Sequence, residues 1–303
     1  MMVPDAQARF ATPHCPVEAM RLQRLGALDP TLRLDERHVL RACHTPAGPG
    51  TLQLRWDGTT VLADAWGPGA GWLVSRAPAI SGAQDEPTAL VAREPWLEQI
   101  VRTLEHVALG RAPRLFDTLV AYVLQQRVPF IEAAASWRRL IEQHGHQAPG
   151  PHGLRLPLTP RQWRGLSSAE LASFDVDRQR AAIVHEVALY ARKIDALDEA
   201  PLSDARALLP KLRGIGPWTQ GIVLGVGRGD PDAVPVGDFA MPSLVTRAFT
   251  GQPRGDDRQM LQLLEPYRGQ RFRVMRLLFA AGYRRQRLGP RRGRSHGRRG
   301  YGR

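Results

Sequence analysis

The chain has 303 residues, enough for two or three domains with cores of their own, and Cys15 and Cys43 are too few for a four-cysteine metal site or a disulfide framework. Its formal net charge is +13, nearly all from arginine because Lys193 and Lys211 are the only lysines. This balance favours a polyanionic partner, since a guanidinium group can donate two bonds to one phosphate; codon composition is the alternative explanation.

The N-terminal part of the chain carries no targeting signature. No apolar run reaches the ~20 residues needed to cross a bilayer, and residues 1–20 lack the apolar core of a secretion signal. We therefore expect a cytoplasmic protein with reduced thiols. Residues 1–35 mix Pro, Ala and Arg without a clear period, so they are expected to be loosely ordered apart from a short helical piece near residues 18–25.

A small β-rich domain is predicted over residues 36–85. Three short runs favour strands, at residues 39–43, 51–56 and 60–66. Asp57-Gly58 between the second and third runs is typical of a two-residue hairpin turn. A helical turn is expected around residues 71–76.

Residues 86–282 read almost entirely as helix. Apolar residues recur at spacings of three and four, which places them on one helical face. Such faces are predicted at residues 97–107, 115–124, 131–140, 181–194, 257–265 and 271–281. Residues 145–160 hold too many Pro and Gly for a helix and are predicted to form a loop, and Asp177 is the expected cap of the next helix. Residues 283–303 contain nine arginines and no acidic residue, so they are expected to form a disordered basic tail.

The most informative stretch is a helical hairpin expected at residues 204–226. Ser203 is a suitable cap for its first helix, at residues 204–211, and Gly214-Ile215-Gly216 leads into the second helix. Glycine lets backbone approach another molecule closely, and Pro217 fits the first helical position. The N–H groups of that helix start suit a phosphate oxygen, so the hairpin is predicted to clamp a nucleic-acid backbone.

The run LRGIGPWT from Leu212 to Thr219, followed by VPVGD ending at Asp238, resembles the helix-hairpin-helix DNA glycosylases, most of all the 3-methyladenine DNA glycosylase II type. The similarity covers roughly residues 110–285. It implies an α+β fold, with a mostly helical two-lobed glycosylase core and a small sheet domain before it. It also implies a cytoplasmic, nucleoid-associated monomer that binds double-stranded DNA containing a damaged base.

The expected clamp on the DNA backbone comprises Gly214, Ile215 and Gly216, with Arg213 and Thr219 as helping side chains. In the family, carbonyl groups of such hairpins often hold a monovalent cation. No other cofactor is expected. Three histidines in the predicted loop, His144, His146 and His152, match no standard zinc spacing and are assigned to solvent.

Asp238 is the candidate catalytic residue. Cleavage of an N-glycosidic bond builds positive charge on the deoxyribose, and a fixed carboxylate beside the sugar stabilises that charge. Its place 22 residues after Gly216 matches the catalytic Asp of the family. The alternative is that Asp238 caps a helix predicted at residues 239–250, and the two roles are compatible.

Trp218 occupies the position at which strand-nicking relatives carry a Schiff-base lysine. Tryptophan forms no imine, so the resemblance implies a monofunctional enzyme that uses water and leaves an abasic site. An alkylated purine is cationic and leaves without protonation. Its selection can rest on cation–π contacts with aromatic faces, worth ~1–2 kcal/mol in a desolvated pocket.

By the same resemblance, Trp218, Phe239 and Phe279 match aromatic positions of the base pocket. Ile222 stands where the family has a tyrosine, which makes the expected pocket less aromatic. Ordinary core packing is the alternative for Phe239 and Phe279.

The family fills the gap left by a flipped nucleotide with a wedge residue from a turn between two helices. The matching stretch here is Gln125-Gln126-Arg127, just before Pro129, with Gln126 and Arg127 as the wedge candidates. The type it resembles most uses leucine, whereas arginine would fill the gap by stacking and hydrogen bonding. These residues are otherwise unremarkable as polar surface side chains.

The expected function is hydrolysis of the N-glycosidic bond of alkylated purines such as 3-methyladenine in duplex DNA, the first step of base excision repair. One alternative is a helix-hairpin-helix protein that binds DNA without catalysis. Another is a glycosylase for deaminated or oxidised bases, which would need a proton donor to the base; the sequence offers no obvious donor near the hairpin.

Overall fold

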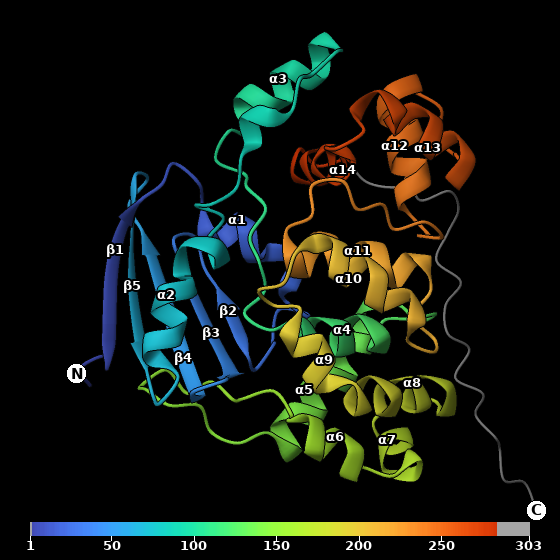
Figure 1. Cartoon of the computed structure of the whole chain (residues 1–303). Helices are drawn as coiled ribbons and strands as arrows, with labels where there is room; N and C mark the ends of the chain where they lie inside the picture. Colours follow the sequence, from blue (N-terminus) through green and yellow to red (C-terminus); the bar gives the residue numbers. More distant parts are fainter. Residues whose placement is uncertain (1, 284–303) are drawn as a thin grey trace, which may run out of the picture.

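The computed structural model describes residues 2–283, so the expected basic tail lies outside the described residues except for Tyr283. A five-stranded antiparallel sheet stands beside a larger helical part (Figure 1). Its strand order is β1-β5-β4-β3-β2. The strands are β1 (Ala6–Ala11), β2 (Leu32–Leu34), β3 (His38–Thr45), β4 (Gly48–Trp56) and β5 (Thr60–Trp66).

The three predicted strands are confirmed as the consecutive strands β3, β4 and β5. Asp57 sets the turn between β4 and β5, because its Oδ1 accepts hydrogen bonds from the backbone N–H groups of Thr59 and Thr60 at 2.9 and 2.8 Å. Helix α2 (Ala70–Ile80), longer than the predicted turn, packs on the sheet and inserts Leu73 into its core. The sheet therefore has a buried face of its own.

The prediction that residues 1–35 are loosely ordered was wrong. β1 pairs with β5 from Ala6 opposite Ala65 to Ala11 opposite Thr60. The chain continues through α1 (Pro16–Met20) and the 3₁₀ turn η1 (Arg21–Gln23) to β2. β1 is an edge strand whose partner lies far along the chain, and short edge strands carry little local pattern. The sheet domain therefore starts well before residue 36.

Helices and the loops between them make up the rest of the described chain. No helix among the described residues has the length and apolar character needed to span a membrane. In Figure 1, α3 and α12–α14 lie toward one end, α5–α9 toward the other, and α4, α10 and α11 between them. The helices are α3 (Pro95–Thr103), α4 (Leu115–Leu124), α5 (Phe130–His144), α6 (Pro160–Gly165), α7 (Ser168–Ser173), α8 (Arg178–Leu189), α9 (Ala191–Ala196), α10 (Leu202–Leu208), α11 (Pro217–Arg228), α12 (Met241–Thr250), α13 (Asp257–Leu264) and α14 (Arg271–Ala280). Three further 3₁₀ turns are η2 (Pro87–Ala89), η3 (Leu209–Lys211) and η4 (Glu265–Tyr267).

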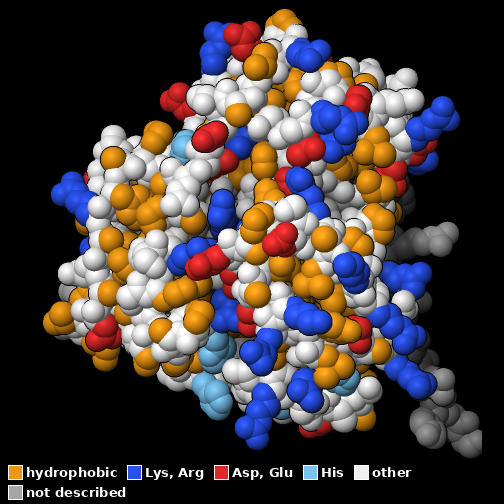
Figure 2. Space-filling model, viewed as in Figure 1, with side chains coloured by type: hydrophobic (Ala, Val, Ile, Leu, Met, Phe, Trp, Pro, Cys, Tyr) orange, Lys and Arg blue, Asp and Glu red, His pale blue; other side chains and the backbone are white. Residues whose placement is uncertain are grey.

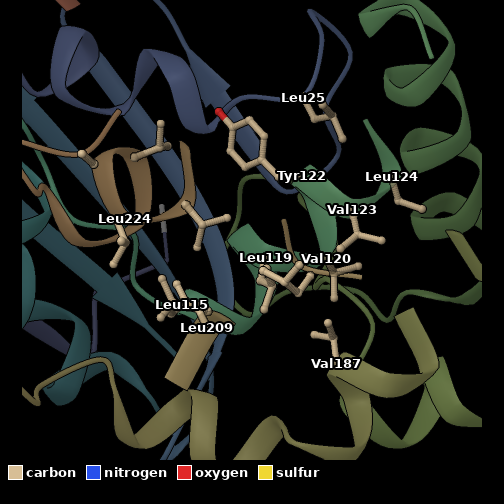
Figure 3. Packing of buried hydrophobic residues seen from close by; sticks show 14 of the residues in the cluster. Leu25, Leu115, Leu119, Val120, Tyr122, Val123, Leu124, Val187, Leu209 and Leu224 are labelled. Atoms are coloured by element: carbon tan, nitrogen blue, oxygen red, sulfur yellow. The ribbon is translucent and has the colours of Figure 1, made fainter. Parts of the chain in front are cut away.

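Helix α4 is the centre of the helical core. Every residue of α4 except Ala121 is buried, including the polar residues Asp117 and Thr118. Figure 3 shows side chains of α4 packed with Val187 of α8, Leu209 of η3 and Leu224 of α11. The ends of α4 are therefore held in place relative to the hairpin formed by α10, η3 and α11.

Four helices show how their first residues are capped. Asp177 caps α8 as expected, accepting a bond from the N–H of Arg180 at 3.0 Å. Ser203 is not a cap, because α10 starts at Leu202 after Pro201. The short helices α6 and α7 were not predicted. Each starts with a capping box, Thr159 with Gln162 and Ser167 with Glu170.

Candidate active site

The hairpin turn is built from two glycines with different roles. Gly214 has φ of +82°, and a Cβ on it would lie 2.4 Å from Cγ1 of Ile183, so glycine is required by the protein's own packing. Gly216 has extended backbone, and a Cβ there would meet nothing within 4 Å. Leu212 and Ile215 are buried and anchor the turn from inside. Gly216 is therefore the glycine that leaves room for another molecule.

Helix α11 begins directly after Gly216. Pro217 takes the first helical position, and the N–H groups of Trp218 and Thr219 belong to the first turn, where a helix has no acceptor of its own. The helix dipole adds positive potential at this end. Arg213 is exposed beside the turn. The arrangement suits one phosphate group against Gly216.

Two of the expected clamp residues contribute differently from the prediction. Thr219 is only 2% exposed, and its Oγ1 accepts a hydrogen bond from Nε2 of Gln126 at 2.9 Å. Its side chain therefore faces the protein, so the expectation that Thr219 helps to hold the DNA backbone through its side chain was wrong. The side chain of Ile215 is likewise in the core, which leaves its backbone for any contact with a partner.

Asp238 lies between α11 and α12, partly exposed, with both carboxylate oxygens held. Its Oδ2 accepts a bond of 2.8 Å from the indole N–H of Trp218. Its Oδ1 accepts bonds of 2.8 Å from the backbone N–H groups of Ala240 and Met241. Through these bonds Asp238 holds the start of α12, which begins two residues later than predicted and has Ala240 as its N-cap. The bond to Trp218 aims the carboxylate toward the hairpin.

Packing of the α11–α12 connection on α11 brings Asp238 to Trp218. A Cβ on Gly221 would lie 2.3 Å from the carbonyl oxygen of Val234, so only glycine allows this close approach. Gly237, with φ of +91°, then turns the chain beside Trp218, and its N–H donates to the carboxylate of Asp257. The carboxylate is therefore positioned by backbone packing on both sides.

Tyr122 on α4 belongs to the same group of side chains and was missed by the sequence analysis. Its ring meets that of Trp218 edge-on, with centroids 6.1 Å apart. Its hydroxyl donates to the carbonyl of Leu22 at 2.9 Å. Burial, and to a smaller extent the negative charge of Asp238, raise the pKa of the Tyr122 hydroxyl, so it stays neutral. In the sequence, the only indication of this role was the position of Tyr122, one helical turn before the expected wedge.

The other expected pocket residues are spread over three elements. Phe239, next to Asp238, is 83% exposed, so core packing does not account for it. Ile222 is half-buried one turn beyond Trp218 on α11. Phe279 is half-buried on α14 and packs against the main core. Phe272 of α14 packs closely on α11, because its ring would lie 2.3 Å from a Cβ on Gly225.

Comparison with known proteins agrees with this arrangement, although no protein-family model matches the chain. A 3-methyladenine DNA glycosylase from Archaeoglobus fulgidus superimposes with a TM-score of 0.72 at 18% identity, over 90% of this chain and 97% of that one. The 8-oxoguanine glycosylase/lyase of Clostridium acetobutylicum, in complex with DNA, gives 0.67 at 12% identity, over 92% and 98%. The chain has the fold of the helix-hairpin-helix DNA glycosylases.

A similarity in sequence points to the same fold. The probable bifunctional transcriptional activator/DNA repair enzyme AlkA of two Mycobacterium tuberculosis strains is 29% identical over 167 residues. The match covers 53% of this chain and 30% of those proteins, so the chain spans less than a third of the length of the curated relatives.

In this glycosylase fold, the expected wedge lies on the turn between α4 and α5. Arg127 is exposed and has φ of +60°, an uncommon backbone conformation for a residue other than glycine. Its Nη1 donates to Oε1 of Gln179 at 3.2 Å. The carboxamide of Gln126 is bonded to the hairpin instead of projecting from the turn. Arg127 is therefore the more exposed of the two wedge candidates, and the wedge role stays a prediction.

A cavity of about 20 Å³ borders Tyr122 and is lined by residues of α4, α5, β3, the end of α4 at Gln125 and the segment at residues 22–29. That volume holds about one water molecule. A purine does not fit there in this conformation.

Three backbone carbonyl groups of the hairpin are the candidate ligands for the expected cation. The carbonyl groups of Leu212, Gly214 and Ile215 each accept one hydrogen bond within the described chain, and each keeps a second lone pair. Among the described residues no group of His, Cys, Asp and Glu could hold a metal ion.

Cys43 is fully buried, which raises the pKa of its thiol to about 12 and keeps it protonated.

Proposed function

We propose that the protein is a monofunctional DNA glycosylase that releases alkylated purines, such as 3-methyladenine, from duplex DNA and so initiates base excision repair. The observation that carries this proposal is the carboxylate of Asp238, held by Trp218 and two backbone N–H groups beside a helical hairpin. A carboxylate fixed in this way costs no reorganisation when charge develops on a sugar.

DNA binding is proposed to start at the hairpin. One phosphate of the damaged strand would lie against Gly216, contacted by the N–H groups at the start of α11 and by Arg213. Figure 2 shows lysine and arginine side chains over much of the visible face, including the right-hand edge where Figure 1 places α8, and these charges favour a polyanionic partner. The damaged nucleotide is then turned out of the duplex toward Asp238.

The proposed reaction breaks the bond between C1′ of the deoxyribose and the ring nitrogen of the base. Both bonding electrons leave with the alkylated purine. The purine is positively charged while bound to the sugar, so it is neutral once it has left. Asp238 stabilises the sugar cation electrostatically while water adds to C1′ and loses a proton to solvent. The products are the free base and an abasic site.

Selection of the base is proposed to rest on aromatic faces. Trp218 and the exposed ring of Phe239 flank Asp238, and Phe279 and Ile222 complete the expected pocket. An electron-poor cationic ring gains ~1–2 kcal/mol from such faces when desolvated. With Ile222 in place of a tyrosine, the pocket is expected to grip the base less tightly and to accept fewer lesions.

A monofunctional mechanism is proposed because Trp218 stands where strand-nicking relatives have lysine. The two lysines of the chain lie elsewhere, Lys193 on α9 and Lys211 in η3 before the turn. No cofactor is part of the proposed reaction, apart from a possible role of a monovalent cation at the hairpin carbonyls. We further infer a monomer acting on double-stranded DNA in the cytoplasm, associated with the nucleoid.

The test is release of base from duplexes that contain 3-methyladenine or 7-methylguanine, compared between wild type and Asp238→Asn. The asparagine Oδ1 can still accept the bonds from Ala240 and Met241, so the fold and DNA binding are expected to persist. The single-turnover rate is expected to fall at least ~100-fold.

Other outcomes of this assay assign other functions. If wild type binds the duplex and releases no base, the protein is a DNA-binding module. If hypoxanthine, uracil or 8-oxoguanine leaves faster than 3-methyladenine, the substrate class is deaminated or oxidised bases.

A further inference from the structure

The side chain of Gln126 connects the α4–α5 turn to the DNA-binding hairpin. Its Nε2 donates to the carbonyl oxygen of Gly214 at 3.1 Å and to Oγ1 of Thr219 at 2.9 Å. These two acceptors lie on either side of Gly216, the open glycine of the hairpin. A single carboxamide therefore links the turn to both arms of the proposed phosphate site.

Helix α8 supports the same junction from the other side. Arg180 is buried, and its Nη1 donates to the carbonyl of Leu124 at the end of α4 at 2.8 Å. Ile183 of α8 fills the space against Gly214. Arg127 reaches back to Gln179 at the start of α8. The turn, the hairpin and the N-terminal half of α8 are thus bonded to one another.

The backbone at Arg127 indicates that this junction is under constraint. Its φ of +60° is uncommon for an arginine and persists only where neighbouring structure holds it. The bonds of Gln126 stand immediately before it in the chain. They therefore fix the direction in which Arg127 leaves the turn.

We propose that Gln126 is a positioning residue that sets the spacing between the phosphate grip at Gly216 and the wedge at Arg127. This inference rests on the proposed function. Flipping one nucleotide requires that the phosphate beside it and the gap in the stack be contacted together, at a separation fixed by the DNA. A side chain misplaced by about 1 Å loses much of that advantage.

The test compares Gln126→Ala with Gln143→Ala, an exposed glutamine near the far end of α5. Each variant is assayed in single turnover on a lesion paired in duplex DNA and on the same lesion opposite an abasic site, where extrusion is easier. Gln126→Ala is expected to lower the rate roughly tenfold on the paired lesion, as for the loss of about one net hydrogen bond. On the unpaired lesion the loss is expected to be less than about twofold.

A second variant controls for folding. Gln126→Glu keeps the volume of the side chain and can still accept a bond from the Thr219 hydroxyl, but it cannot donate to the Gly214 carbonyl. It is expected to show the same contrast between the two substrates, with a melting temperature near that of wild type. Fluorescence of 2-aminopurine next to the lesion is expected to rise less than in wild type.

The outcomes separate this inference from the proposed function. Equal losses of rate on the two substrates, or no loss on the paired lesion, would overturn the role of Gln126 and leave the glycosylase proposal intact. Failure of wild type to release any base would refute the proposed function, and the positioning role with it.

Discussion

The indole N–H of Trp218 donates a hydrogen bond of 2.8 Å to Oδ2 of Asp238. The two residues stand 20 positions apart, on α11 and just before α12. Because the indole donates only one bond, it orients the carboxylate without competing for its remaining lone pairs. Trp218 thus holds the carboxylate, and the proposed function gives its ring a second role as a face of the base pocket.

Replacement of Trp218 by phenylalanine separates these two tasks. The aromatic face remains, but the bond to Asp238 is lost, so the carboxylate is less well fixed at the sugar. We expect single-turnover base release to fall roughly tenfold, while binding to a duplex with an abasic site changes little. Trp218→Ala, which removes both the bond and the ring, should cost clearly more. Equal effects of the two substitutions would show that the hydrogen bond contributes nothing.

The two glycines of the hairpin predict opposite phenotypes. Gly216→Ala is expected to fold normally, because the new methyl group meets no atom, and to bind DNA about tenfold more weakly because that methyl occupies the phosphate site. Gly214→Ala has to place a side chain at positive φ against Ile183, so we expect a loss of about 2–4 kcal/mol of stability. Urea unfolding and a DNA-binding titration on both variants measure the difference. Normal DNA binding by Gly216→Ala would remove the hairpin from the interface.

Because position 218 is not a lysine, the expected product is an abasic site in an unbroken DNA strand. After base release the DNA strand is expected to stay intact until it is heated in alkali, and borohydride is expected to trap no covalent complex. Gel electrophoresis with and without alkali provides the measurement. Strand breakage in neutral buffer, at a rate that matches base release, would contradict a monofunctional mechanism.

Asp117 on α4 predicts a pH dependence of stability. It is buried, its Oδ2 has no hydrogen-bond partner among the described residues, and burial raises the pKa of its carboxyl from 3.8 to about 6. The folded state therefore binds the proton of Asp117 more tightly than the unfolded state does. Protonated Asp117 contributes its full share of the free energy of unfolding below pH 4, and this share is lost as the pH rises through 6.

Asp117→Asn cannot titrate, so its stability relative to wild type should be greater at pH 8 than at pH 5, by about 1 kcal/mol. Urea unfolding at the two pH values gives this difference. Asp204→Asn, at an exposed carboxylate, serves as the control. An identical pH profile for wild type and Asp117→Asn would mean that Asp117 is ionised in the folded protein at pH 5.

Two helices that were not predicted, α6 and α7, carry a recognisable start signal in the sequence. The capping boxes of α6 and α7, Thr159 with Gln162 and Ser167 with Glu170, were present in the sequence. They were overlooked because these helices are short and follow a segment rich in Pro and Gly. β1 offered much less, because an edge strand is recognised by its partner, and its partner β5 lies beyond three other strands in the chain.

Local chemistry let the sequence alone determine the hairpin, the candidate carboxylate and most helices and strands. Gly-X-Gly before Pro217, the cap at Asp177 and the apolar faces each depend on residues a few positions apart. Only the tertiary structure decided which side chains meet. Asp238 meets Trp218 because Val234 approaches Gly221 closely. Gln126 meets the hairpin at the carbonyl of Gly214. These contacts join segments far apart in the chain, and their geometry depends on how whole helices pack, which no short spacing in a sequence specifies.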